Sequence, residues 1–253
     1  MKSLLKALGS APLSTAGLAV LLPYLALALT AMGSVLHHRR LRARYGDQFG
    51  MWLYFALFFL LLAALPVLVL TVTEQHPGRF LLAIGLRAGN WRTGLPILVP
   101  ALPLAVLIGA FASRSTEMRA FYPLSRAACS SKGRFIAYEL GYVILYYTAW
   151  EFLYRGLLFF PLVDRLGLLA AASLSTALSV LHHIGHPDSE IIGALLGGYL
   201  FCAVAFLTDS MVYPLAIHAT LGVSNDLFLY LRYPAENQSG RRLGAPPHRR
   251  MRR

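Results

Sequence analysis

Apolar residues form long, unbroken runs along this chain, and short polar or basic segments separate them. The runs do not alternate as a half-buried strand would, and most are close to the ~20 residues that an α-helix needs to cross a bilayer. We therefore expect an all-α, polytopic helical membrane protein with about seven transmembrane helices, within a range of roughly six to eight. The expected spans lie near 14–36, 50–73, 94–112, 135–162, 167–184, 190–208 and 210–231.

The composition agrees with this pattern. Of the 253 residues, 57% are hydrophobic and only 13% are charged, whereas a soluble chain carries roughly 25% charged residues. The continuous runs also disfavour an outer-membrane β-barrel, whose strands alternate. The first run is longer than the ~7–15 apolar residues of a signal peptide, so we interpret it as the first transmembrane helix.

Basic residues are concentrated between and after the apolar runs, and the formal net charge is +12. They gather in HHRRLRARYGD after the first span, in the segment 113–134 and in the C-terminal RRLGAPPHRRMRR. In a membrane protein, such segments face the cytoplasm and contact anionic lipids, so lipid rather than nucleic acid is the expected partner. We predict a single membrane domain over 1–233 and a basic, disordered cytoplasmic tail over 234–253.

A few ionisable and polar residues interrupt the apolar spans. Ionisable side chains are costly inside a bilayer and by default mark a functional site. The fourth span carries two acids and a base, the fifth ends in SVLHHIGHP, and the seventh contains YPLAIHATLGVSND. The candidates are Glu139, Glu151, Arg155, His182, His183, His186, His218, Asn225 and Asp226.

Glu151 and Arg155 are four residues apart in the stretch WEFLYRG, so their side chains meet on one helix face. One interpretation is a buried ion pair that fixes how the helices pack. The other is a carboxylate that the guanidinium keeps ionised, and that can accept a proton from water. The histidines of the later spans favour the second interpretation if they converge with Glu151 on one polar cavity.

Metal binding and disulfide bonding receive less support from the sequence. His182 and His186 would share a helix face and could bind zinc, but Gly185 and Pro187 indicate that the helix ends there. The chain has no HExxH motif. Its two cysteines, Cys129 and Cys202, form no disulfide framework. We therefore predict no cofactor, and a zinc site remains the less favoured alternative.

The order of these motifs resembles the CAAX protease and bacteriocin-processing (CPBP, or Abi) family of intramembrane proteases. The resemblance covers roughly residues 120–230 and is strongest at AWEFLYRGLLF, LHHIGHPDSEIIGALLGGYL and YPLAIHATLGVSND. The first family motif is usually Glu-Glu-x3-Arg, and here Trp150 stands at its first position. The third is His-x3-Asn or Asp, and here Gly222 follows His218 by four residues.

The resemblance implies metal-free hydrolysis by a glutamate. Glu151 and a histidine would activate a water as general base. The second motif, Phe-x3-His, has two possible registers here, Leu178 to His182 and Ser179 to His183, and we favour His183 because it leads the HIG of HIG-x-P. His218, with Asn225 or Asp226, would stabilise the oxyanion, and Arg155 would orient Glu151. Trp150 replaces the first glutamate of the motif. Glu151 therefore either acts as the general base and also pairs with Arg155, or it only pairs with Arg155 and another residue is the base.

The most favoured function is thus an intramembrane endopeptidase of a bacterial inner membrane that cuts a membrane-associated protein or peptide. Two alternatives stay open. The chain could be a non-catalytic scaffold or bacteriocin-immunity protein of the same fold. It could also be a metal- or proton-coupled carrier that uses the His/Glu cluster, although it lacks the paired broken helices and repeat halves of transporters.

Overall fold

The computed structural model describes residues 14–232, and in that range the chain is built from helices and turns. The predicted tail, 234–253, and the first 13 residues lie outside the described residues. The longer elements are α2 (Thr15–Gly33), α4 (Asp47–Phe59), α5 (Leu65–Thr73), α7 (Trp91–Ala112), α9 (Lys132–Gly141), α12 (Leu168–His182), α13 (Asp188–Thr208) and α14 (Val212–Arg232). The shorter ones are α3 (His38–Tyr45), α6 (Pro77–Ala83), α8 (Thr116–Phe121), α10 (Thr148–Glu151) and α11 (Phe159–Leu166).

Each of the seven predicted spans corresponds to a helix or a helical run, so the all-α prediction is confirmed. Within residues 14–232, three helical runs are long and apolar enough to cross a membrane: Asp47–Thr73, Trp91–Ala112 and Asp188–Thr208. The bent pair Ala19–Gly33 and His38–Tyr45 makes a fourth if it is one span. The structure therefore supports a multi-pass membrane protein with three or four such candidate spans.

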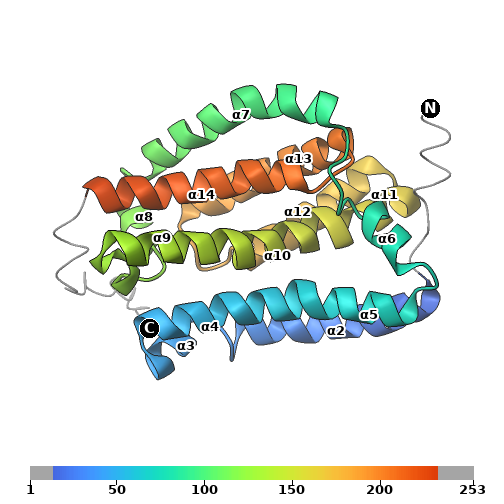
Figure 1. The fold of residues 1–253 in the computed structure, drawn as a ribbon, viewed down its shortest axis with the longest axis horizontal. Coiled ribbons are helices and arrows are strands. Elements are labelled where there is room, and N and C mark those ends of the chain that lie inside the picture. The colour runs from blue at the N-terminus through green and yellow to red at the C-terminus, as the bar shows by residue number, and fades with distance from the viewer. Residues whose placement is uncertain (1–13, 233–253) are drawn as a thin grey trace, which may run out of the picture.

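The long helices lie nearly parallel along the long axis of the molecule (Figure 1). α7 lies along α14, and glycines permit their close approach: a side chain at Gly109 would meet the backbone nitrogen of Asn225 at 2.8 Å. α12 packs on α13, and α2 packs on α5. The helical run from α9 to α11 lies between these layers and carries the predicted acids.

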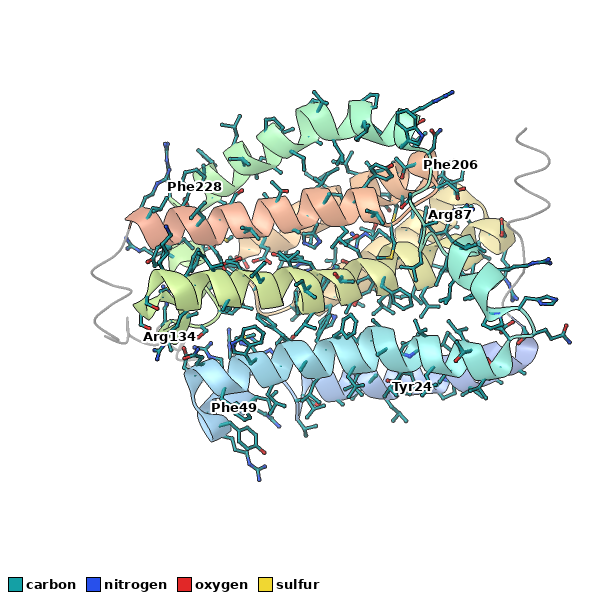
Figure 2. The ribbon with its side chains drawn as sticks, in the orientation of Figure 1. Tyr24, Phe49, Arg87, Arg134, Phe206 and Phe228 are labelled. Carbon is teal, nitrogen blue, oxygen red and sulfur yellow. The ribbon has the colours of Figure 1, made fainter. Side chains whose placement is uncertain are left out.

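Two of the predicted basic segments, 37–47 and 113–134, lie at one end of the bundle, and the third lies outside the described residues. Figure 1 places α3, α8, the start of α9 and the end of α14 at the same end. In Figure 2, Arg134 lies at that end, and Arg87 lies at the opposite one. Arg87 forms an ion pair with Asp209 there. The turn between α12 and α13 also belongs to the basic end, because Arg39 of α3 donates to the carbonyl oxygen of Gly185 at 3.4 Å.

The run that carries the Glu151 motif is not a regular α-helix. Two π-helical segments, Tyr142–Tyr147 and Phe152–Leu157, flank α10 on either side. A wider π turn rotates the side chains that follow it relative to an α-helix, and such turns occur frequently at functional sites. The sequence predicted one continuous helix here, so the faces that its side chains occupy could not be read from a period of 3.6 residues.

Candidate active site

One pocket lies where α12 turns into α13 and meets the Glu151 run and α14. Its cavity volume is about 20 Å³, which is room for about one water. Three histidines, one carboxylate and five aromatic side chains form its wall. The lining residues are Tyr122, Tyr142, Tyr146, Tyr147, Trp150, His183, His186, Glu190 and His218. The fifth and seventh predicted spans thus bring their histidines to one place.

Glu151 lies behind His218. Its Oε1 accepts a hydrogen bond from Nδ1 of His218 at 2.6 Å, and its Oε2 is 3.4 Å from Nε of Arg155. The side chains of Glu151 and Arg155 are 0% and 2% exposed. Arg155 also donates to the hydroxyl of Ser179 at 3.3 Å and lies over the ring of Phe201. The pair therefore fixes the ring of His218 while itself having no contact with solvent.

His183 reaches the pocket from the first residue after α12. Its Nδ1 is 2.8 Å from the carbonyl oxygen of Ser179. A carbonyl oxygen can only accept, so Nδ1 carries a proton, and in the neutral imidazole Nε2 then presents its lone pair. Nε2 is 3.8 Å from Oε1 of Glu190.

The neighbouring histidine takes a different direction. His182 forms a hydrogen bond with the hydroxyl of Tyr154 at 2.9 Å and stacks on Trp150 at 4.9 Å between ring centroids. Of the two possible registers, the structure thus places His183 on the pocket.

Glu190, in the first turn of α13, is the carboxylate of the pocket wall. Its Oε1 accepts from the hydroxyl of Tyr122 at 2.7 Å and from Nδ1 of His186 at 2.9 Å. Its Oε2 is buried with no hydrogen-bond partner among the described residues. Burial and the Glu190 charge raise the pKa of Tyr122 well above its usual value, so its phenol stays protonated and donates.

The same group could hold a metal ion. The ligand atoms of His183, His186 and Glu190 all lie within 4.8 Å of one another. Two imidazoles and a carboxylate are a donor set that suits zinc. The hydrogen bond from His183 to a backbone carbonyl is also the kind of outer contact that metal-binding histidines make. The sequence pointed to His182 and His186 for such a site, whereas the structure groups His183 with His186.

Trp150 takes part in the pocket wall. Its ring is 1% exposed, stacks on Phe58 at 6.0 Å, and meets His183 edge-on at 4.7 Å. Of the carboxylates within residues 14–232, Glu190 lines the pocket and Glu151 does not. The indole of Trp150 thus faces the pocket, whereas the neighbouring Glu151 contacts the site only through His218.

Asn225 and Asp226 lie in another polar cluster. The Asn225 amide donates to Asp226 Oδ1 at 3.1 Å, and the hydroxyl of Tyr138 donates to Oδ2 at 3.4 Å. Glu139 is buried, and the charge of Asp226 acts on it. Neither Asn225 nor Asp226 is among the residues that line the pocket. Their assignment to the oxyanion stays a prediction that no contact with the pocket supports.

Gly222, at the position where the family pattern has Asn or Asp, makes room for a tyrosine. A side-chain carbon built on Gly222 would lie 1.7 Å from the hydroxyl oxygen of Tyr147. Tyr147 lines the pocket and packs edge-on against His218 at 4.8 Å. A pocket hydroxyl therefore occupies the space that a longer residue at 222 would need.

The sequence did not single out Glu190, Tyr122 or Tyr147. Glu190 follows Pro187 and Asp188, and acids in the first turn of a helix have an ordinary explanation in the helix dipole. One signal was available: Glu190 is four residues after His186, which is the spacing of side chains that meet on a helix. No pattern in the sequence marks Tyr122 or Tyr147, and only the tertiary contacts show them at the pocket.

Both cysteines are free, as expected. Burial raises the pKa of the Cys129 thiol to about 12, so it stays protonated. Cys202 is buried and donates to Ser175 at 3.7 Å. Neither residue lines the pocket, and the described structure thus gives no support for a nucleophilic cysteine.

Comparison with known proteins matches residues 133–223 to the family model described as type II CAAX prenyl endopeptidase Rce1-like. The matched segment starts in α9, contains Glu151, Arg155, His183, Glu190 and His218, and ends just before Ser224. No curated protein and no solved structure matches the chain. The earlier resemblance, over roughly residues 120–230, is confirmed for this segment.

Proposed function

Because residues 133–223 carry a type II CAAX prenyl endopeptidase Rce1-like domain, we propose that this protein is an intramembrane endopeptidase. It hydrolyses a peptide bond of a membrane-associated protein or peptide, with a water activated by a carboxylate and a histidine. The family is one of proteases, and the helices that surround the domain suit a lipid bilayer. The chemistry needs no resident cofactor.

The observation that carries the proposal is the convergence of His183 and His218 on one pocket. The two residues come from separate helices, 35 positions apart (218 − 183), and each has its Nδ1 held by an oxygen: a backbone carbonyl for His183 and Glu151 for His218. Two imidazoles fixed in this way can bind a water and stabilise the developing oxyanion. In the proposed site, Arg155 holds Glu151 and Glu151 holds His218.

The direct test uses full-length protein reconstituted in liposomes. The probes are an internally quenched farnesylated CAAX peptide and an internally quenched library of single-span transmembrane peptides. We expect cleavage by the wild type, and a fall of about 10²–10⁴-fold in His183→Gln and His218→Gln. Both variants should accumulate and unfold like the wild type. His182→Gln is the matched control and should retain activity.

The result also separates the alternatives. Failure of the wild type to cleave either probe would contradict the endopeptidase proposal. If the histidine variants lose cleavage but keep the cellular role of the gene product, that role is a scaffolding or immunity function.

We also propose a location and an orientation. The basic end of the bundle, with α3, α8 and the pocket-bearing turn, faces the cytoplasm of a bacterial cell and contacts anionic lipids. The C-terminus then also lies in the cytoplasm, and the substrate reaches the pocket from that side. A reporter fused to the C-terminus, active only in the cytoplasm, should be active. Activity of a periplasm-specific reporter at that place would reverse the orientation.

A further inference from the structure

We propose that Glu190, and not Glu151, is the carboxylate that takes the proton from the attacking water. This inference rests on the proposed endopeptidase function and names the catalytic residue within it. Glu190 is the acid on the pocket wall, and its side chain is 19% exposed, whereas Glu151 is 0% exposed. A general base must reach the water that it deprotonates, directly or through one water.

Nε2 of His183 and Oε1 of Glu190 face each other at a separation that suits a bridging water. Nε2 of His183 has no proton, because Nδ1 donates to Ser179, and Oε1 of Glu190 is a second acceptor 3.8 Å away. Two acceptors do not hydrogen-bond to each other. A water with straight hydrogen bonds of about 2.8 Å joins acceptors about 4.4 Å apart, donating one hydrogen to each, and slightly bent hydrogen bonds bring the acceptors closer. The pair thus fits a single water held between an imidazole and a carboxylate.

Two donors fix the carboxylate in place. Tyr122, at the end of α8, and His186, in the turn before α13, both donate to Oε1 of Glu190. Such hydrogen bonds favour the ionised carboxylate, which is the form that accepts a proton. Oε2 remains without a partner among the described residues, so the carboxylate keeps capacity to hold the proton it takes up.

Glu151 is already committed to other contacts. Its Oε1 accepts from His218, and its Oε2 faces Arg155. It acts through His218 and is a positioning residue. Trp150, its neighbour, fills with an apolar ring the part of the pocket wall that adjoins His183. Glu190 therefore supplies from α13 the carboxylate that the Glu151 run does not present to the pocket.

The step balances without any further reactant. The water oxygen attacks the carbonyl carbon of the scissile bond, and one water proton passes to the Glu190 carboxylate. The C–N bond then breaks as the protonated Glu190 gives that proton to the leaving nitrogen. The second water proton stays on the new carboxylic acid, which then transfers it to the amine, so the products are a carboxylate and an ammonium group, and Glu190 returns to its ionised form.

The experiment compares two neutralising substitutions on one helix, assayed with the two peptide probes above. In Glu190→Gln, kcat should fall about 10²–10⁴-fold with KM nearly unchanged. In Asp188→Asn, two residues earlier and exposed, kcat should not change. Glu190→Asp keeps the charge but withdraws it by one methylene, and should lose less than Glu190→Gln. If Glu190→Gln does not accumulate, the activity of Glu190→Asp still tests whether Glu190 is the general base.

Three results would overturn the inference. If Glu190→Gln keeps activity within threefold of the wild type, Glu190 is not the base, although the endopeptidase function stands. If the wild type contains one bound zinc by elemental analysis, loses activity to a chelator and loses the zinc in Glu190→Gln, then Glu190 is a metal ligand. If the wild type cleaves neither probe, the inference fails together with the proposed function.

Discussion

Glu151 and Glu190 contact different histidines of the site, His218 for the first and His183 and His186 for the second, and their surroundings differ in kind. Glu151 is fully buried between Arg155, one turn later in the same helical run, and His218 of α14. Glu190 is at the pocket wall, held by a tyrosine and a histidine and partly open to solvent. A carboxylate sealed behind the site organises the structure, whereas one on its surface can exchange a proton with water. Exposure of the side chain and the arginine beside Glu151 separate the two roles, since both residues are glutamates.

The largest expected difference is in stability. Glu151→Gln leaves the buried guanidinium of Arg155 without its counter-charge, and removing one partner of a buried ion pair costs about 3–5 kcal/mol. Glu190→Gln keeps an acceptor oxygen for Tyr122 and His186, and should cost no more than about 1 kcal/mol. Thermal unfolding in detergent measures both. Equal stability of the two variants would remove the distinction between the carboxylates.

A double substitution sharpens this result. Glu151→Gln combined with Arg155→Met removes both charges and leaves a side chain of similar length, so most of the lost stability should return. Activity should stay low, because a neutral amide at position 151 accepts a weaker hydrogen bond from His218 than the carboxylate does. Recovery of both stability and activity would show that Glu151 serves packing alone.

A smaller effect is expected at Gly222, where the Tyr147 hydroxyl occupies the space that a side chain would need. Gly222→Ala forces the Tyr147 hydroxyl to move and should cost about 1–3 kcal/mol through overpacking. Gly193→Ala, on α13 with open space around it, should be neutral or stabilising by up to about 1 kcal/mol. Adding Tyr147→Phe to Gly222→Ala should restore part of the stability. No restoration would locate the clash elsewhere.

The smallest effect is expected at Tyr122. Tyr122→Phe removes one of the two donors to Glu190 and should cost about 0.5–1.5 kcal/mol of stability. The lost hydrogen bond stabilised the ionised carboxylate, so the pKa of Glu190 should rise. The activity of the variant should therefore fall more at low pH than at high pH. The pH profile of kcat/KM measures this, with Tyr142→Phe, also on the pocket wall, as the control. Identical profiles for the two variants would show that the Tyr122 hydroxyl does not act on Glu190.

The helical architecture and half of the site were accessible from the sequence. Long apolar runs mark membrane helices because a bilayer leaves no partner for unpaired backbone groups. Glu151 and Arg155 could be paired from their spacing, and they form the ion pair. Glu151, His183 and His218 were expected to converge on one cavity; the two histidines line the pocket, and Glu151 contacts His218 without lining it. These inferences succeeded because they depend on local periodicity or on the rarity of polar side chains in lipid.

The other half of the site could not be predicted from the sequence. Two π-helical segments alter the faces of the run around Glu151, and a pattern of period 3.6 cannot represent them. Asn225 and Asp226 follow His218 at a longer spacing than the family motif, and Asp226 contacts Tyr138 and Asn225, while neither residue lines the pocket. Glu190 looked like an ordinary acid at a helix start, and its role depends on neighbours far away in the chain.

The sequence by itself determined that this is a helical membrane protein with a short list of buried ionisable residues, because hydrophobicity and the cost of charge in lipid are properties of each segment. Only the tertiary structure decided which of those residues share a pocket. Tyr122, His183, Glu190 and His218 come from four separate segments, and their convergence depends on how helices turn, bend and pack. The tertiary structure also placed Trp150 on the pocket wall and Glu151 behind it, because rotation about a helix axis is fixed by packing and not by spacing alone.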